Sequence, residues 1–118
     1  MCTNAKGHTI ILGNDGNSVG PMESVLMAIA SCSTIDIVMI LEKMKQQIDD
    51  IEVTVEGERA AEIPKVYKKI KVHYKLYGKI KEKKAEQAVN SSIEKYCSVA
   101  LMIKKTAEIT ASFEVIES

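Results

Sequence analysis

The longest hydrophobic stretch of the chain is VLMAIASCSTIDIVMIL, at residues 25–41. Pro21 stands just ahead of it, where the fixed φ of proline suits a first helical turn, and Glu23 complements the positive end of the helix dipole. These signals predict one long helix from Pro21 to about Gln47. Because apolar residues occupy every side of this helix, each side must be covered by other parts of the protein.

Alternation of apolar and polar residues predicts the strands. GHTIILGNDGNS contains a short strand, Thr9 to Leu12, followed by a polar loop, and IEVTVEGE alternates over residues 51–58. VYKKIKVHYKLYGK predicts a strand over residues 66–77, which Gly78 ends. One face of this strand is expected to be buried and the other exposed. The expected inner residues are Val66, Ile70, Val72, Tyr74 and Leu76, and the expected outer residues are Tyr67, Lys69, Lys71, His73 and Lys75.

The last third of the chain returns to a helical period. KEKKAEQAVNSSIEKYC, at residues 81–97, predicts an amphipathic helix, since its smaller and apolar residues recur at spacings of three and four. Its expected inner face consists of Ala85, Ala88, Val89, Ser92, Ile93 and Tyr96. A short helical piece at 98–105 and a strand at 106–117 follow. This order indicates an α+β fold with antiparallel sheet rather than alternating βαβ units, and one domain over residues 1–118.

Charge and hydropathy limit the partners that we expect. The 16 basic and 16 acidic side chains give a formal net charge of zero, which argues against a nucleic acid partner. The apolar run at 25–41 is shorter than the roughly 20 residues that span a bilayer and contains Asp36, so we expect no membrane segment. The start of the chain, MCTNAKGHTI, has no secretory signal pattern, which predicts a cytoplasmic protein.

The same apolar run predicts self-association. Two small sheets and one further helix could hardly cover the long helix on all sides. A second copy of the chain is the economical source of that cover. The sequence therefore predicts an intertwined homodimer.

The chain contains three cysteines, Cys2, Cys32 and Cys97. A disulfide framework needs a larger and even number, so we expect reduced thiols. Cys32 and Asp36 are four residues apart and share a helix face; Asp36 either orients the thiol or makes a structural hydrogen bond. Cys97 stands at a helix junction, where free amides can stabilise a thiolate. Cys2 is expected to be a free terminal thiol.

We expect no metal site and no cofactor. The two histidines, His8 and His73, are isolated and lack metal-ligand spacing with the cysteines. The five lysines that surround His73 on its strand are expected to be a solvated outer face of the sheet.

In the segments that contain Glu23, Cys32 and Cys97, the chain resembles the OsmC family, which includes osmotically inducible and organic hydroperoxide resistance proteins. GPMESVLMAIASCSTIDIVMIL is similar to the family's first cysteine helix, with its proline and a glutamate ahead of the thiol. VEGERAAEIPKVYKKIKVHYKLYG resembles the central strand pair, and EKYCSVALMIKKTAEITASFEV the second cysteine segment with the last strand. The three blocks occur in the family's order and cover roughly residues 18–116.

The resemblance implies an OsmC-like fold, in which two long helices at the centre of an intertwined homodimer are wrapped by sheets. It also implies a thiol peroxidase that acts on organic hydroperoxides, with Cys32 as the peroxidatic thiol, Cys97 as the resolving thiol and Glu23 as the carboxylate of the site. An external dithiol would reduce the resulting disulfide. An apolar surround would favour alkyl or lipid hydroperoxides.

The family's amino-terminal strands are expected to be shortened here. In the family that region supplies an arginine that holds the thiolate, whereas the only arginine of this chain is Arg59. Arg59 is therefore a possible supporting residue, as is Asp36. Glu23 and Cys32 are nine residues apart, on opposite sides of an ideal helix, so Glu23 serves either its own or the partner's thiol. The alternative function is an OsmC-like dimer without efficient turnover that binds a small apolar ligand or senses oxidation.

Overall fold

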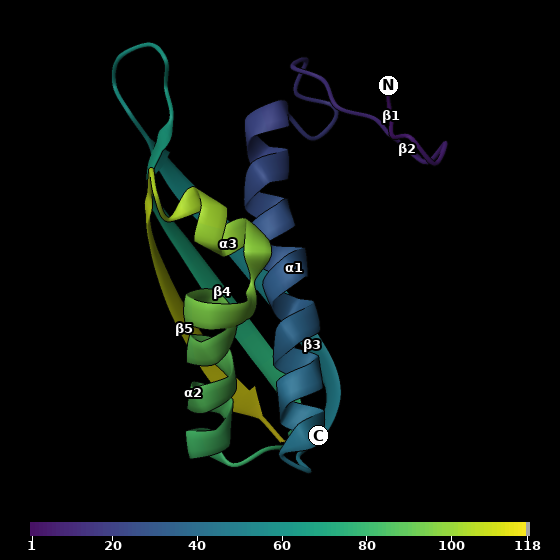
Figure 1. Ribbon diagram of the computed structural model, residues 1–118, viewed down its shortest axis with the longest axis vertical. Helices are drawn as coiled ribbons and strands as arrows, with labels where there is room; N and C mark the ends of the chain where they lie inside the picture. Colours follow the sequence, from purple (N-terminus) through teal and green to yellow (C-terminus); the bar gives the residue numbers. More distant parts are fainter. Residues whose placement is uncertain (118) are drawn as a thin grey trace.

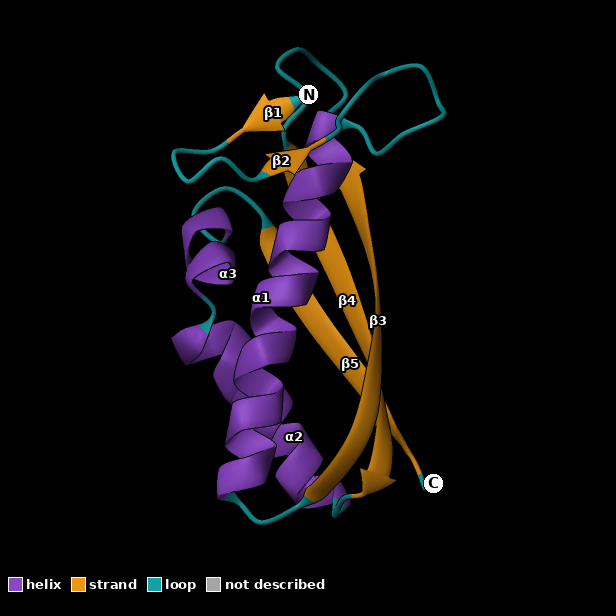
Figure 2. Ribbon diagram, turned by 90° about the vertical axis from the view of Figure 1, so that its right-hand side faces the viewer, coloured by secondary structure: helices purple, strands orange, loops and turns teal. Residues whose placement is uncertain are grey.

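The helices and strands form two layers (Figure 1). The computed structural model describes residues 1–117. In chain order the elements are β1 (Cys2–Thr3), β2 (Thr9–Ile10), α1 (Pro21–Lys43), β3 (Gln47–Arg59), β4 (Tyr67–Lys79), α2 (Glu82–Ser91), a π-helical turn (Ser92–Tyr96), α3 (Ser98–Ile103) and β5 (Glu108–Ile116). All three helices lie on one face of the sheet formed by β3, β4 and β5 (Figure 2). This arrangement confirms the predicted α+β class.

The sheet has the order β3-β4-β5 and is mixed. β3 and β4 pair antiparallel, as predicted, but β5 runs parallel to β4, so the prediction of a purely antiparallel sheet is wrong. The reason lies in the connection. The helices between β4 and β5 return the chain along the sheet, so that β5 starts at the same end as β4 and the segment is a βαβ crossover.

Two short strands, β1 and β2, form a separate antiparallel pair at the end of the molecule where α1 begins (Figure 2). The predicted strand from Thr9 to Leu12 is present only as Thr9–Ile10. Its partner β1 was not predicted, because two residues are too few to show an alternating pattern.

Helix α1 begins at Pro21, as predicted, and ends at Lys43 rather than at about Gln47. Lys45 has a φ of 60°, which breaks the helical path, and the amide of Gln46 donates to the carbonyl of Leu41. The residues after this cap enter β3 directly. The polar segment that resembled a continued helix is thus a turn and the start of a strand.

A bulge changes which residues of β4 face the core. The expected inner residues Ile70, Val72, Tyr74 and Leu76 are buried. The pairing of β3 with β4 then shifts between Glu58 and Arg59, which turns Tyr67 inward and leaves Val66 40% exposed. The prediction for Val66 and Tyr67 is therefore wrong, since an extra residue reverses the alternation beyond the bulge.

The predicted helix at 81–97 divides into α2 and the π-helical turn. The residues from Ala85 to Ile93 that were expected on its inner face are buried, but Tyr96 is 59% exposed. The wider turn is closed by the amide of Cys97, which donates to the carbonyl of Ser92 at 2.7 Å. One added residue in this turn rotates Tyr96 away from the core and places Cys97 at the start of α3.

One side of α1 packs on the sheet and the other side is open. Leu26, Ile29 and Leu41 are buried, whereas Met27, Ile35 and Met39 are exposed. The helix is long and apolar enough to cross a membrane, with a mean hydropathy of 2.1 over its best window, of which 33% is buried. Core helices of soluble proteins pass the same test.

Candidate functional site

Two helices bring Cys32, Asp36 and Cys97 together. Cys32 and Asp36 occupy successive turns of α1, and Cys97 precedes the first turn of α3, which packs beside α1 (Figure 2). The two sulfur atoms and a carboxylate oxygen of Asp36 all lie within 4.8 Å of one another. The disulfide implied by the family resemblance requires the two cysteines to be neighbours in the folded protein, and they are.

Cys97 is fully buried at the amino-terminal cap of α3. The amide of Ala100 donates to its Sγ at 3.4 Å, and Sγ lies 4.0 Å from the carbonyl oxygen of Ile29. The pKa of Cys97 is nevertheless raised to about 11: burial is the largest cause, the Ala100 amide lowers the pKa, and the neighbouring Cys32 adds to the rise. The expected amide contact is therefore present, but it is outweighed by the loss of solvent.

Cys32 is more accessible than Cys97, being half-buried on α1. Its Sγ lies within 4.8 Å of both the Cys97 sulfur and a carboxylate oxygen of Asp36. Oδ2 of Asp36 is buried without a hydrogen-bond partner among residues 1–117. Of the two alternatives for Asp36, the structural hydrogen bond is thus not found for this oxygen.

A cavity of about 380 Å³ reaches this cluster at Asp36, between α1 and α2. Its wall is mixed, with thioether and alkyl groups from α1 and polar groups from α2. The lining residues are Asp36, Met39, Ile40, Lys43, Met44, Gln87, Ser91 and Tyr96. The space is suited to a small molecule with an apolar part.

A buried polar network, missed by the sequence analysis, lies next to the thiols. The hydroxyl of Tyr74 and Oγ of Ser33 are hydrogen-bonded, and Ser33 Oγ also donates to the carbonyl of Ala30 at 3.1 Å. Because Ser33 has one proton to give, Tyr74 is the donor in the first bond. Ser92 Oγ donates to the carbonyl of Ser33 at 2.9 Å, which ties the π-helical turn to α1.

The two thiols affect the pKa of the Tyr74 hydroxyl. Its pKa is raised to about 12: burial is the largest cause, the hydrogen bond with Ser33 lowers the pKa, and the nearby Cys97 and Cys32 add to the rise. Alternation along β4 places Tyr74 inside, but nothing in the sequence indicated that it would face Cys32. That relation depends on how α1 lies across the sheet.

Glu23 and Arg59 lie away from the thiol cluster. Oε1 of Glu23 accepts from the amide of Gly20 at 3.0 Å and so caps the first turn of α1. Nine residues of helix separate it from Cys32, about 13.5 Å along the axis at 1.5 Å per residue. Arg59 lines the same cavity of about 480 Å³ as Glu23, and its Nε donates to the carbonyl of Lys65 at 2.9 Å.

Tyr67 lies close to both of these charges. Burial raises its pKa, Arg59 lowers it and Glu23 raises it. The hydroxyl of Tyr67 donates to the carbonyl of Met22 at 2.8 Å, which fixes β4 against the start of α1. The structure therefore forms two groups of predicted site residues, one around the thiols and one at the start of α1.

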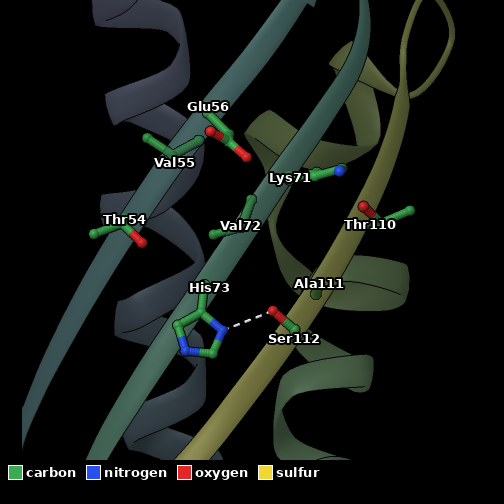
Figure 3. Close-up of a pocket in the computed structure, with 9 residues that line it drawn as sticks. All are labelled: Thr54, Val55, Glu56, Lys71, Val72, His73, Thr110, Ala111 and Ser112. Carbon is green, nitrogen blue, oxygen red and sulfur yellow. Dashed lines mark hydrogen bonds between the residues drawn. The ribbon is translucent and has the colours of Figure 1, made fainter.

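The outer face of the sheet carries a third polar group (Figure 3). His73 Nδ1 is hydrogen-bonded to Ser112 Oγ at 2.7 Å, and His73 Nε2 lies 3.7 Å from Glu114. A surface cavity of about 500 Å³ lies over these strands. His73 was expected on this face, opposite Tyr74, and it links β4 to β5 there.

Two relatives are similar over nearly the whole chain. Protein YhfA of Escherichia coli K12 is 45% identical over 115 residues, which cover 95% of this chain and 86% of YhfA. A hypothetical protein from Aquifex aeolicus VF5 is 40% identical, with a TM-score of 0.88, over 98% of this chain and 86% of that one.

A more distant relative shares the fold. An organic hydroperoxide resistance protein OsmC from Legionella pneumophila has a TM-score of 0.71 at 21% identity, over 86% of this chain and 74% of that one. The family model described as OsmC-like protein matches residues 13–112, which include Cys32, Asp36 and Cys97. The resemblance found in the sequence is thereby confirmed: this chain belongs to the OsmC-like protein family.

Proposed function

We propose that this protein is a thiol-dependent peroxidase that reduces organic hydroperoxides. The observation that carries the proposal is the proximity of the Cys32 and Cys97 sulfur atoms, within 4.8 Å, in an OsmC-like protein. Membership of the family points to a role in peroxide stress, and a solved relative is an organic hydroperoxide resistance protein. The thiol pair supplies the chemical groups for such a role.

Cys32 is the nucleophile in this proposal. It is the more accessible thiol, whereas Cys97 keeps its proton at neutral pH because its pKa is raised to about 11. The Cys32 thiolate attacks the distal oxygen of the hydroperoxide, the O–O bond breaks, and the alkoxide leaves as an alcohol after taking up a proton. Cys32 is left as a sulfenic acid.

Cys97 resolves that intermediate. Its sulfur attacks the sulfur of the sulfenic acid, water leaves, and a Cys32–Cys97 disulfide forms. An external dithiol then reduces the disulfide and restores both thiols. The short distance between the two sulfur atoms favours this step over further oxidation of Cys32.

The cavity beside Asp36 supports an organic rather than an inorganic peroxide. Its volume of about 380 Å³ and its lining by Met39, Ile40 and Met44 fit an alkyl or aryl group. Such a group would be desolvated there while the peroxide oxygens face the thiol cluster.

The proposal includes a homodimer. Met27, Ile35 and Met39 form an exposed apolar stripe along α1, at spacings of four and eight residues. Burying this stripe against a second copy would remove the apolar surface from water. We further propose that Glu23 serves Cys32 of the partner subunit, because Glu23 lies in the first turn of α1, about 13.5 Å along the helix axis from its own thiol in mid-helix.

The test is a stopped-flow assay with cumene hydroperoxide and dithiothreitol as the reductant. We expect consumption that saturates with the peroxide and disappears in a Cys32→Ser variant. A Cys2→Ser variant is the matched control, since Cys2 is exposed and outside the cluster, and it should keep full activity. Consumption by the unmodified protein no faster than by Cys32→Ser would overturn the proposal.

A second function is favoured by the position of Arg59. The only arginine of the chain lies beside Glu23 rather than beside Cys32, so no guanidinium from the same chain activates the thiol. In this alternative the protein is an OsmC-like dimer that senses oxidation, or binds a small apolar ligand, without efficient turnover. A single oxidation of Cys32 per chain, with no further consumption after reductant is added, would favour it.

A further inference from the structure

We infer that Cys32, Asp36 and Cys97 form a binding site for a thiophilic divalent cation of the zinc class in the reduced protein. One carboxylate oxygen of Asp36 and the two sulfur atoms lie within 4.8 Å of one another. Thiolate sulfur together with carboxylate oxygen is a donor set that zinc accepts. The inference is independent of peroxide turnover, because it concerns only the reduced thiols.

The arrangement of the ligands suits one ion. Cys32 and Asp36 are at positions i and i+4 of α1, the spacing at which a helix presents two side chains to a single metal. Cys97 comes from the cap of another helix and closes the third side. With metal–sulfur distances near 2.3 Å and metal–oxygen distances near 2.1 Å, tetrahedral ligands lie about 3.5–3.8 Å apart. The cluster therefore needs to contract by roughly 1 Å, which side-chain rotation supplies.

A second observation points to a cation at this place. Oδ2 of Asp36 is buried and has no hydrogen-bond donor among the described residues. A carboxylate oxygen without a partner is costly to bury, and a bound positive ion would supply the missing partner. The sulfur atoms beside it make a soft cation the better match. Three protein ligands leave a fourth position open to water or to a small molecule.

Binding has a clear chemical balance. The two thiols lose one proton each, the two thiolates balance the two positive charges of the ion, and the Asp36 carboxylate leaves the loaded site with a net charge of −1. A Cys32–Cys97 disulfide removes both sulfur ligands at once. Binding of the cation and oxidation of the thiols therefore exclude each other, which would make the loaded site sensitive to oxidants.

The experiment is a titration of the protein with cobalt under anaerobic conditions. The protein is first reduced and freed of metal with a chelator, and it is used in whatever oligomeric state it adopts. Cobalt replaces zinc and reports thiolate ligands through a charge-transfer band. We expect the band to saturate at one ion per chain and to be displaced by added zinc. It should be absent in Cys32→Ser and Cys97→Ser, and absent after diamide has taken two electrons and two protons from the thiol pair.

Asp36→Asn is the decisive variant, because the amide has the shape of a protonated carboxyl group. We expect cobalt binding to be weakened on the order of tenfold to a hundredfold or more. Zinc should raise the thermal midpoint of the unmodified protein and not that of Asp36→Asn, provided that circular dichroism shows both are folded. Cys2→Ser, which changes a thiol outside the cluster, should bind as the unmodified protein does.

Three results would overturn the inference. The first is the absence of a thiolate-to-cobalt band in the folded, reduced protein. The second is unchanged affinity in Asp36→Asn and the third is loss of the band in Cys2→Ser, either of which would place the ion elsewhere. None of these results depends on the peroxidase assay, so the two proposals succeed or fail separately.

Discussion

The sulfur atoms of Cys32 and Cys97 lie within 4.8 Å of each other, although they belong to helices at opposite ends of the sequence. Helix α1 carries the first and the cap of α3 carries the second. The π-helical turn contains one residue more than an α-helical turn, and this extra residue helps to orient Cys97 toward α1. This proximity is the basis of the first prediction.

One equivalent of cumene hydroperoxide should produce a disulfide between Cys32 and Cys97 within each chain and leave Cys2 free for alkylation. The reason is that the sulfur atoms of Cys32 and Cys97 are close enough to condense, whereas Cys2 is exposed and outside their cluster. Peptide mapping by mass spectrometry checks this. In Cys97→Ser, Cys32 should proceed to the sulfinic acid. A bridge that contains Cys2 would contradict the resolving role of Cys97.

The exposed stripe on α1 should hold two chains together. Ile35 is 63% exposed, and replacing it by lysine would place a charge within the proposed contact. We expect the unmodified protein to sediment as a dimer at micromolar concentration and Ile35→Lys to dissociate at least about tenfold more readily, a change of about 1.4 kcal/mol. Ile63→Lys is the control, because Ile63 is 88% exposed in the loop between β3 and β4. A folded monomer of the unmodified protein at this concentration would contradict the proposed dimer.

Stability should fall at alkaline pH. The pKa of Cys97 rises from 9.0 to about 11 and that of Tyr74 from 10.0 to about 12 in the folded state. Between these values the unfolded chain binds fewer protons than the folded chain, so the free energy of unfolding decreases as pH rises. Each group should remove on the order of 2 kcal/mol, whereas below about pH 8.5 neither contributes a slope.

Urea unfolding measured across this pH range tests the effect. Tyr74→Phe removes one of the two groups and should flatten the decline above pH 10.0, the ordinary pKa of tyrosine. An identical decline in Tyr74→Phe would mean that other groups cause it.

The hydrogen bond between Ser33 and Tyr74 should be visible as an energetic coupling. Ser33→Ala leaves the buried Tyr74 hydroxyl without its acceptor, which should cost about 1–3 kcal/mol. Tyr74→Phe removes the donor and should cost about 1 kcal/mol. Because the double variant leaves no unsatisfied Tyr74 hydroxyl, its cost should be smaller than the sum of the two. Additive costs in denaturant unfolding would argue against a shared bond.

Most elements could be predicted from the sequence because their periods are local properties. The alternation of β3 and β4, the proline start of α1 and the small-residue face of α2 all follow from neighbouring residues. Family blocks added the expectation that Cys32 and Cys97 approach each other. The errors fell where local patterns are interrupted, as at the bulge that turns Tyr67 inward and at Lys45, which ends α1 early.

The sequence by itself determined the apolar character of α1 and the α+β class, and it singled out Cys32 and Cys97 as the candidate thiol pair. Only the tertiary structure decided that β5 runs parallel to β4, that the cap of α3 brings Cys97 to the face of α1 that carries Cys32 and Asp36, and that Glu23 and Arg59 of the same chain lie away from it. These are relations between segments far apart along the chain, and they depend on how α1 crosses the sheet. The pKa of Cys97 belongs to the same group, because it is set by burial and by neighbours that the linear sequence does not place beside it.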